Sequence, residues 1–288
     1  MNASQIEEDG RQPMSEISYR GLFNLTGKVA VVTGGVGILG QHFCAGLAES
    51  GANVAVVDLL GKKAQETAQA LTERYKTKAI GVGCDVSDPK SVQAMVKEVV
   101  AAFGEINVLH NNAAGKSDDL DAFFAPFEEY RLDQWRKIMA VNLDGMFLVA
   151  QAVGKQLVGQ GKGGSIIQTA SIYGVMAPDH RIYEGSFYLG RRINTPAVYS
   201  ASKAAVIGLT RHLATYWADN KIRVNTLTPG GTESGQNEEF KRRYSARIPL
   251  SRMAAPQEMV GALLYLASDA SSYVTGQNIM VDGGLNCW

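Results

Sequence analysis

Short apolar segments alternate with longer segments of helical periodicity along almost the whole chain, and this order constrains the fold more than any other feature. The apolar segments are rich in Val, Ile and Ala without polar alternation, as expected of strands buried on both faces of a sheet. Seven such strands separated by six helices predict a parallel, doubly wound α/β sheet with helices on both faces. The strands are expected at 28–33, 53–58, 78–85, 106–112, 165–171, 222–229 and 277–284.

The segments of helical period lie between these strands, and nothing between them divides the chain. No internal repeat, low-complexity linker or shift in composition appears, so a single domain is expected over 25–288, preceded by a flexible polar tail at 1–24. A chain of 288 residues with 45% hydrophobic content can bury a core unaided. The helices are expected at 38–50, 62–75, 89–103, 130–157, 198–219 and 256–269.

Charge and cysteine content exclude several classes of function. The 28 basic residues balance 28 acidic ones without any basic block, so no nucleic acid or anionic membrane is expected as a partner. The three cysteines and four histidines are scattered and form neither a disulfide framework nor a metal-binding pattern. No apolar run approaches the roughly 20 residues that span a bilayer, and the polar start does not resemble a signal peptide. We therefore expect a soluble cytoplasmic protein without a catalytic metal.

A glycine-rich segment, TGGVGILG at 33–40, joins the first strand to the first helix. Its Gly35, Gly37 and Gly40 satisfy the GxGxxG spacing that lets backbone N–H groups at a helix start approach a pyrophosphate. Glycine-rich turns also serve simple chain reversal, but the position between a strand and an amphipathic helix favours dinucleotide binding. We expect the cofactor to contact Gly34, Gly37, Ile38 and Leu39.

Acidic residues at the ends of the next two strands are candidates for the adenosine half of the cofactor. Asp58 lies 18 residues after Gly40, where a carboxylate can accept hydrogen bonds from ribose hydroxyls and repel a 2′-phosphate. This favours NAD over NADP, although Lys62 and Lys63 could fold back, and a solvated turn residue is the alternative for Asp58. Asp85 could accept from the adenine amino group or could belong to the cap of the following helix.

A Tyr-x-x-x-Lys pair, Tyr199 and Lys203, opens the helix expected at 198–219. The spacing places both side chains on one helix face. A phenol titrates near pH 10, so it needs a nearby ammonium and a cationic nicotinamide ring to lower its pKa toward neutrality. The pair therefore suits proton exchange with a substrate hydroxyl while a hydride moves to or from a nicotinamide.

Over residues 24 to 286 the chain resembles the short-chain dehydrogenases/reductases, a family with a Rossmann-type fold. The matching segments stand in the family order: TGGVGILG, CDVS, NNAAG, VNLDGMF, IIQTAS, YSASK, RVNTLTPGG and TGQNIMVDGG. The resemblance implies that Tyr199 is the general acid/base, that Lys203 tunes it and holds the nicotinamide ribose, and that Ser171 binds the reacting oxygen. It also implies that Asn142 keeps a water in the proton relay. The further cofactor contacts that it implies are Val86, Asn112, Ala113, Ala114, Pro229, Gly230 and Thr232.

Two positions depart from the family pattern. The pattern TGxxxGxG would place glycine at 38, where this chain has Ile38 and has Gly37 one place early. The usual NNAG reads NNAA, which adds a methyl group at Ala114. The first departure allows the path of the pyrophosphate loop to shift by about one residue.

The segment between the catalytic serine and tyrosine is long. Ser171 and Tyr199 are separated by 27 residues, where most relatives have about a dozen, and we expect the insertion at 172–197 to form part of the substrate pocket because ligands bind at this sheet edge. The segment SIYGVMAPDHRIYEG resembles dehydrogenases of flagellin-modification sugars, and fructuronate-reductase and gluconate-dehydrogenase-like members are a second resemblance. The alternative for its arginines is a solvated loop face or a subunit contact. The candidate substrate contacts besides Ser171 are Arg181, Tyr183, Arg191 and Arg192.

Together these features predict an NAD-dependent oxidoreductase that acts on a secondary alcohol or ketone of a sugar, sugar acid or sugar derivative. A sugar epimerase or dehydratase using the same Tyr/Lys pair is an alternative, and a non-catalytic dinucleotide-sensing protein is another. The family is usually tetrameric, so a homo-oligomer, tetramer or dimer, is expected. The apolar helix at 256–269 and the tail GLNCW are candidate subunit contacts, with core packing as the alternative.

Overall fold

The computed structural model describes residues 18–115, 117, 119–188 and 190–288. The predicted tail at 1–24 falls outside this range up to residue 17, and a short 3-10 turn at Gly21–Phe23 precedes the first strand. Within the described part of the chain, no helix combines the length and the apolar character needed to cross a bilayer.

A single seven-stranded parallel sheet forms the centre of the molecule, which confirms the predicted fold class. Its strand order is β3-β2-β1-β4-β5-β8-β9, and every pairing in it is parallel. Each strand lies within one of the seven predicted segments, except that β5 begins one residue early, at Gly164. The strands are β1 (Val29–Thr33), β2 (Asn53–Asp58), β3 (Ala79–Gly83), β4 (Val108–Asn111), β5 (Gly164–Thr169), β8 (Ile222–Pro229) and β9 (Asn278–Val281).

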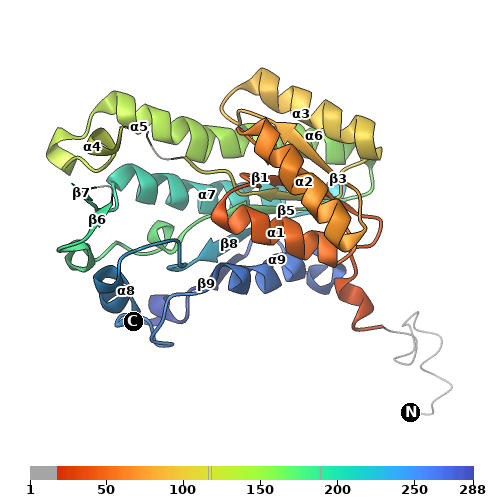
Figure 1. The fold of residues 1–288 in the computed structure, drawn as a ribbon. Helices are drawn as coiled ribbons and strands as arrows, with labels where there is room; N and C mark the ends of the chain where they lie inside the picture. The colour runs from red at the N-terminus through yellow and green to blue at the C-terminus, as the bar shows by residue number, and fades with distance from the viewer. Residues whose placement is uncertain (1–17, 116, 118, 189) are drawn as a thin grey trace, which may run out of the picture.

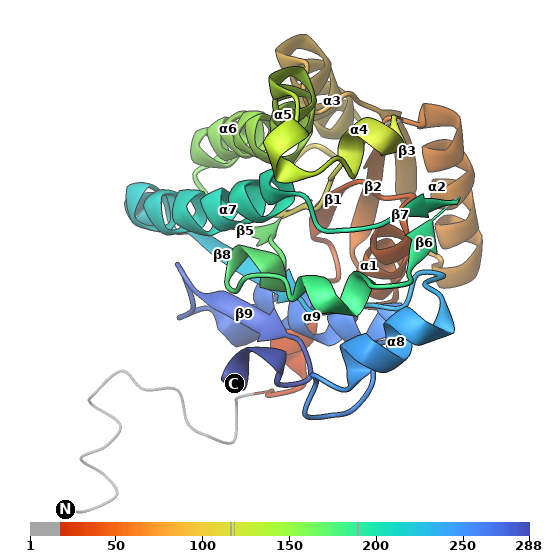
Figure 2. The ribbon, with the colours of Figure 1, turned by 90° about the vertical axis from the view of Figure 1, so that its left-hand side faces the viewer.

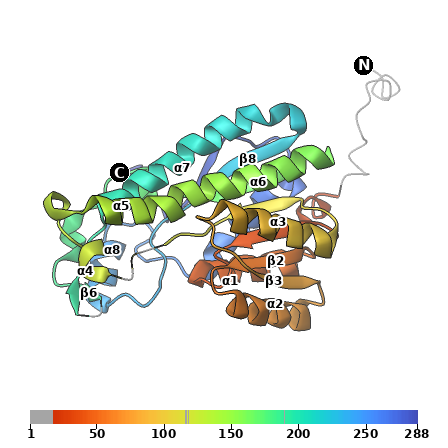
Figure 3. The same ribbon diagram turned by 90° about the horizontal axis from the view of Figure 1, so that it is seen from above.

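Helices cover both faces of the sheet, as the unbroken apolar strands require (Figures 1 and 3). Successive residues of β1 point into opposite cores: Val29 and Val31 into one, Ala30 and Val32 into the other. The first core is completed by α3 (Pro89–Phe103), α6 (Gly145–Gln160) and α7 (Ala197–Tyr216). The second is completed by α1 (Ile38–Glu49), α2 (Gly61–Tyr75) and α9 (Val260–Ala267).

The helix predicted at 130–157 is present but is interrupted. It consists of α5 (Leu132–Met139), one π-helical turn at Ala140–Asp144, and α6. A π-helical turn inserts one residue into the helical repeat and is frequent at functional sites. The buried Asn142 lies within this turn.

Several small elements gather at the carboxyl edge of the sheet, which Figure 2 shows from the front. They are α4 (Leu120–Phe123), α8 (Glu238–Ser245) and, from the long insertion, a hairpin of β6 (Phe187–Tyr188) and β7 (Arg191–Arg192). The strand order reverses between β1 and β4 at this same edge. In open α/β sheets ligands bind at such a reversal, so the fold itself locates the site.

Candidate functional site

A cavity of about 420 Å³ lies at the carboxyl ends of β1, β2, β4, β5 and β8. It brings together segments that are far apart in the sequence, and it includes most of the residues predicted to bind a dinucleotide. Those predicted from the sequence that line it are Gly34, Gly37, Ile38, Leu39, Asp58, Asn112, Ala114, Ser171, Tyr199, Lys203, Pro229, Gly230 and Thr232.

The glycine-rich loop forms the first wall of this cavity. Gly34 has a positive φ of 65°, and the Gly37 N–H donates to its carbonyl oxygen at 3.1 Å, which closes the turn before α1 begins at Ile38. A Cβ atom on Gly40 would lie 2.0 Å from the Gly34 oxygen, so the helix can approach the turn only without a side chain there. The loop therefore keeps its close packing even though Ile38 replaces the glycine of the family pattern.

Asp58, the last residue of β2, faces the same loop. Its Oδ2 accepts a hydrogen bond from the Val36 N–H at 3.2 Å, and its Oδ1 accepts one from the Leu60 N–H at 3.1 Å. These two bonds fix the orientation of the carboxylate toward the cavity. Each carboxylate oxygen can accept a further bond, so Asp58 could receive ribose hydroxyls there.

Ser171, Tyr199 and Lys203 line the other end of the cavity. Ser171 follows β5, and the other two lie on the first turns of α7, so strand end and helix start meet although 27 residues separate the serine from the tyrosine. The Lys203 Nζ lies 6.0 Å from the centroid of the Tyr199 ring. The predicted group is therefore brought into one place.

Two backbone contacts fix Ser171 and the turn after it. The Tyr173 N–H donates to the Ser171 Oγ at 3.2 Å, so one lone pair of the hydroxyl is used and its hydrogen is free to donate. Gly174 packs on the backbone of α7, where an added Cβ would lie 2.6 Å from the carbonyl carbon of Lys203. The turn is consequently pressed against the helix that carries the other two residues.

Burial shifts the acid–base properties of this group. It raises the pKa of the Tyr199 phenol, an effect that the neighbouring Ser171 side chain opposes. Burial also lowers the pKa of Lys203 to about 8. The Lys203 Nζ donates to the Thr169 carbonyl oxygen at 2.9 Å, which compensates in part for its removal from water.

Asn142 lies behind this group in the π-helical turn. Its Oδ1 accepts from the Gly115 N–H at 2.8 Å and so ties the helix to the loop after β4. Its Nδ2 is buried without a hydrogen-bond partner among the described residues. An unpaired buried donor is costly, which suits the relay water that the resemblance implies.

Three of the predicted cofactor contacts lie outside the cavity. Asp85 is exposed and accepts from the Ser87 N–H and Oγ, at 2.9 and 2.6 Å, while Asp88 caps α3. Val86 is buried in the core. Ala113 is partly buried and donates its N–H to Thr33 Oγ1 at 3.0 Å, whereas its neighbour Ala114 lines the cavity.

The four candidate substrate residues of the insertion do not line this cavity either. Arg181 forms an exposed two-point ion pair with Asp179, and Arg191 pairs with Asp121 of α4. Arg192 and Tyr183 line a separate cavity of about 380 Å³, together with His180 and Glu184. Arg181 and Arg191 are thus engaged in ion pairs within the chain, whereas Arg192 lies on the wall of the second cavity.

The insertion is attached to α8. Arg243 bonds to Glu184 at 3.2 Å and to the Arg181 carbonyl oxygen at 2.8 Å, and the Tyr183 ring packs on Phe240 with centroids 5.5 Å apart. Because α8 follows the segment containing Thr232, the insertion is connected to the cofactor cavity through this helix. Tyr183 also belongs to the same apolar cluster as Tyr199.

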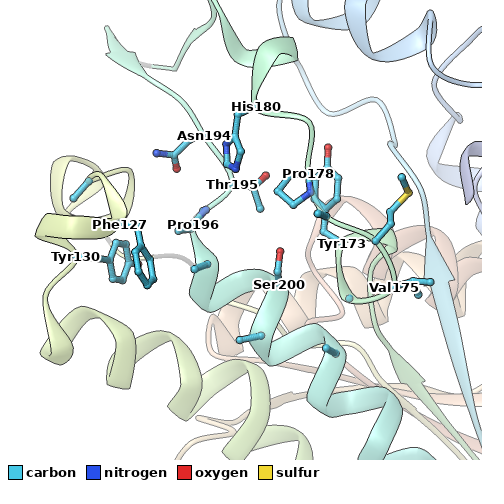
Figure 4. Close-up of a pocket in the computed structure, with 17 residues that line it drawn as sticks. Phe127, Tyr130, Tyr173, Val175, Pro178, His180, Asn194, Thr195, Pro196 and Ser200 are labelled. Atoms are coloured by element: carbon cyan, nitrogen blue, oxygen red, sulfur yellow. The ribbon is translucent and has the colours of Figure 1, made fainter.

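A cavity larger than the cofactor cavity, of about 580 Å³, lies on another side of α7 (Figure 4). Ser200 points into it from the helix, and Tyr173, Pro178 and His180 approach from the insertion. Phe127 and Tyr130 form the opposite wall. Neither Ser171 nor Tyr199 lines this cavity. We therefore do not assign the reaction to it, despite its larger volume.

Three residues of the cofactor cavity were missed in the sequence analysis: Gly40, Thr169 and Ala170. Gly40 stands inside a motif that was recognised, so the motif spacing was a sufficient signal for it. Thr169 and Ala170 directly precede Ser171 at a strand end, which was the available signal. Among the described residues, no three His, Cys, Asp or Glu side chains gather so that they could hold a metal ion.

The match to the family model for short chain dehydrogenases covers residues 28–245. The chain therefore belongs to the short-chain dehydrogenase family. It is 37% identical to a sorbose reductase of Candida albicans over 278 residues, which cover 92% of this chain and 89% of the reductase.

Solved structures of similar proteins extend this comparison. A gluconate 5-dehydrogenase from Burkholderia cenocepacia, in complex with NADP and tartrate, has a TM-score of 0.81 and 33% identity over 93% of this chain and 98% of its own. An NAD⁺-bound xylitol dehydrogenase has a TM-score of 0.79 and 29% identity over 90% and 99% of the two chains. The chain is thus a nicotinamide-dependent oxidoreductase whose relatives act on sugars, polyols and sugar acids.

Proposed function

We propose that this chain is an NAD-dependent dehydrogenase that interconverts a secondary alcohol and a ketone on a sugar, polyol or sugar acid. One observation carries the proposal: Ser171, Tyr199 and Lys203 line the same cavity as the glycine-rich turn and Asp58. A dinucleotide bound along this cavity would place its nicotinamide end near the tyrosine. When bound, the nicotinamide ring supplies the acceptor or donor of the hydride.

The proton chemistry belongs to Tyr199. Burial raises its pKa, so the phenol keeps its proton until positive charge comes near. The ammonium of Lys203 and a cationic ring in the cavity both stabilise the phenolate and lower the pKa. Ser171 donates its free hydrogen to the substrate oxygen, and Lys203, with Asn142 behind it, passes protons toward solvent.

The preference for NAD rests on Asp58. Its carboxylate is fixed by two backbone N–H groups at the edge of the cavity, where a 2′-phosphate would meet like charge. The related structures hold NADP in one case and NAD⁺ in another, so the family alone does not decide the cofactor. Asp85, which is exposed, and Val86 next to it remain our candidates for weaker contacts near the adenine. Ala113 remains a candidate for a weaker contact along the loop after β4.

The insertion at 172–197 is our proposed specificity segment. Tyr183 and Arg192 line one cavity there, and His180 and Glu184 add polar groups that suit a polyhydroxylated ligand. Arg192 is the best placed of the arginines for a carboxylate or phosphate, because Arg181 and Arg191 already have acidic partners. The sugar, polyol and sugar-acid relatives support this class of substrate.

We also propose that the protein acts in the cytoplasm as a homotetramer, with no nucleic-acid or membrane partner. The family resemblance and the balanced charge support this proposal. Two of the three cysteines, Cys44 and Cys84, are buried free thiols, which fits a reducing compartment. Exposed apolar side chains such as Phe147 on α6 and Trp288 at the C-terminus are candidates for subunit contacts.

The direct test is a panel of sugars, polyols and sugar acids, with NADH and NADPH formation followed by absorbance. We expect reduction of NAD with at least one polyol or sugar acid, and a much lower kcat/KM with NADP. If the protein binds NADH but oxidises and reduces no compound of the panel, the substrate class is wrong. If it binds neither NADH nor NADPH, the proposed function itself fails.

A further inference from the structure

A chain of buried hydrogen bonds runs beneath the cofactor cavity and begins at a histidine that the reaction does not use. His110 lies on β4 and is completely buried, with its ring edge against Phe43 at a centroid distance of 4.3 Å. Its Nε2 lies 2.9 Å from the Thr169 Oγ1 on the neighbouring strand β5. A buried polar side chain between two central strands requires a reason, because an apolar residue would pack there without a hydrogen-bond requirement.

Thr169 connects this histidine to both halves of the cofactor cavity. Its carbonyl oxygen accepts from the Lys203 Nζ at 2.9 Å. Its Oγ1 lies 3.4 Å from the Asn112 Oδ1. The Nδ2 of Asn112 in turn donates to the Thr33 carbonyl oxygen at 3.1 Å and approaches that of Gly34 at 3.5 Å. One residue thus contacts the lysine at one end and, through Asn112, the glycine-rich turn at the other.

The donors along this chain can be assigned from its ends. Asn112 uses its NH₂ group on backbone carbonyls, so its Oδ1 must accept, and the Thr169 hydroxyl must donate to it. The Thr169 oxygen then accepts from His110, which places the ring hydrogen on Nε2. Burial lowers the pKa of His110 to about 3, so the ring is neutral and carries only this one N–H. Its Nδ1 is buried without a partner among the described residues.

We propose that His110 is a positioning residue for cofactor binding that acts through Thr169. By holding the Thr169 hydroxyl in the direction of Asn112, it orients the amide that supports the Gly34 turn. By the same contact it fixes Thr169 at the end of β5, and the Thr169 carbonyl oxygen orients the Lys203 Nζ. The inference rests on the proposed dinucleotide site, and it adds a specific role for a residue that touches no ligand.

The test is a double-mutant cycle with NADH affinity, measured by fluorescence titration, as its readout. His110→Leu removes the donor and leaves Thr169 in place, and we expect the Kd for NADH to rise about tenfold, equivalent to about 1.4 kcal/mol. His110→Gln retains an N–H near the position of Nε2, so its Kd should return to within about threefold of the wild-type value. In a Thr169→Val background, His110→Leu should change the Kd no further, since the group through which it acts is gone.

The cycle separates positioning from simple stabilisation. In the His110→Leu/Thr169→Val protein both hydrogen-bonding partners are apolar, so most of the thermal stability should return while NADH affinity stays low. If the His110→Leu protein does not fold, the NADH titration can still be made on this double variant. Thr226→Val is the matched control, because it removes a buried hydroxyl pair with Thr210 of the same 2.9 Å length outside the cavity. We expect it to lower the melting temperature without changing the Kd.

Two results would overturn the inference. One is a Kd for NADH of the His110→Leu protein within twofold of the wild-type value. The other is a change in Kd on His110→Leu substitution that is equally large in the wild-type and Thr169→Val backgrounds. Wild-type protein that binds no nicotinamide dinucleotide would instead remove the proposed function on which the inference depends.

Discussion

The two sides of the site are held in place by different kinds of interaction. On the cofactor side, His110, Thr169 and Lys203 are almost fully buried and are joined by short hydrogen bonds. On the substrate side, the insertion is held by exposed ion pairs, such as Arg181 with Asp179 and Arg243 with Glu184. The proposed reaction chemistry depends on the buried side, and the proposed substrate selection depends on the exposed side.

The difference matters because the two kinds of interaction have different energetic consequences. Leaving a buried polar group without its partner costs about 1–3 kcal/mol, whereas an exposed ion pair contributes about 0.2–1 kcal/mol. Substitutions on the cofactor side should therefore alter binding, catalysis and stability strongly. Substitutions at the exposed charged residues of the insertion should leave the fold intact and change only how substrates are recognised.

The largest effect is expected at Tyr199. Tyr199→Phe removes the proton donor and acceptor but retains the ring, so kcat should fall about 10³-fold while the Kd for NADH changes little. Steady-state rates and NADH titration of the same preparation measure both quantities. A fully active phenylalanine variant would show that the proton passes through another group.

The next largest effect concerns pH and the buried histidine. Below pH 6.5 the unfolded chain protonates His110, but the native state keeps it neutral down to about pH 3. Because the unfolded state then binds more protons, the free energy of unfolding decreases as the pH is lowered. At pH 5 this group should cost the native state about 2 kcal/mol relative to pH 7.5. Urea unfolding at both pH values should show a correspondingly smaller loss for His110→Leu/Thr169→Val. An equal loss in both proteins would mean that His110 does not contribute to the acid sensitivity.

Asp58 tests the cofactor side at its exposed edge. Asp58→Ala removes the carboxylate that we expect to bind the ribose hydroxyls and to repel a 2′-phosphate. The Kd for NADH should rise about tenfold, and that for NADPH should fall or stay constant. Titrations with the two reduced cofactors provide the comparison. Equal losses for both would indicate that Asp58 only supports the Val36 and Leu60 backbone.

The smallest effect is expected on the substrate side. Arg192→Ala should raise KM for an anionic sugar about threefold to tenfold, with KM for NAD and the melting temperature unchanged, because the side chain is exposed on a cavity wall. Arg181→Ala should act in the same direction but more weakly, since its partner Asp179 remains close to Arg247. Arg242→Ala, which breaks an exposed pair with Glu239 on α8, is the control. Unchanged KM in both test variants would make these arginines surface residues only.

The sequence was sufficient to predict most of the fold because strands buried on both faces leave a clear apolar pattern. It did not predict the π-helical turn at Ala140–Asp144, since one extra residue hardly disturbs the periodicity of a helix expected at 130–157. It also missed α8, whose sequence EEFKRRYS has few apolar residues. That helix is stabilised by its Asn237 cap and by Phe240 and Tyr244, which pack under the insertion, and such tertiary contacts cannot be read from local pattern.

The residues of the candidate site likewise divide into those that the sequence identifies and those that only the structure reveals. Asp58, Ser171, Tyr199 and Lys203 were identified because motif spacing and strand ends mark them, and the structure brings them to one cavity. His110 was not, because a lone histidine in an apolar strand carries no sign of its partner. Its hydrogen bond to Thr169 depends on the pairing of β4 with β5, which joins residues 59 positions apart.

The contact between Gly174 and the backbone of α7 has a practical consequence for changing the specificity of this enzyme. Because any side chain at position 174 would collide with the helix at Lys203, the three residues after Ser171 cannot be exchanged together with the rest of the insertion. Pro196 precedes α7 and likewise belongs to the fixed part. A chimaera should therefore be joined at Val175 and Thr195, so that a loop from a relative with a different substrate can be introduced without moving the reactive groups.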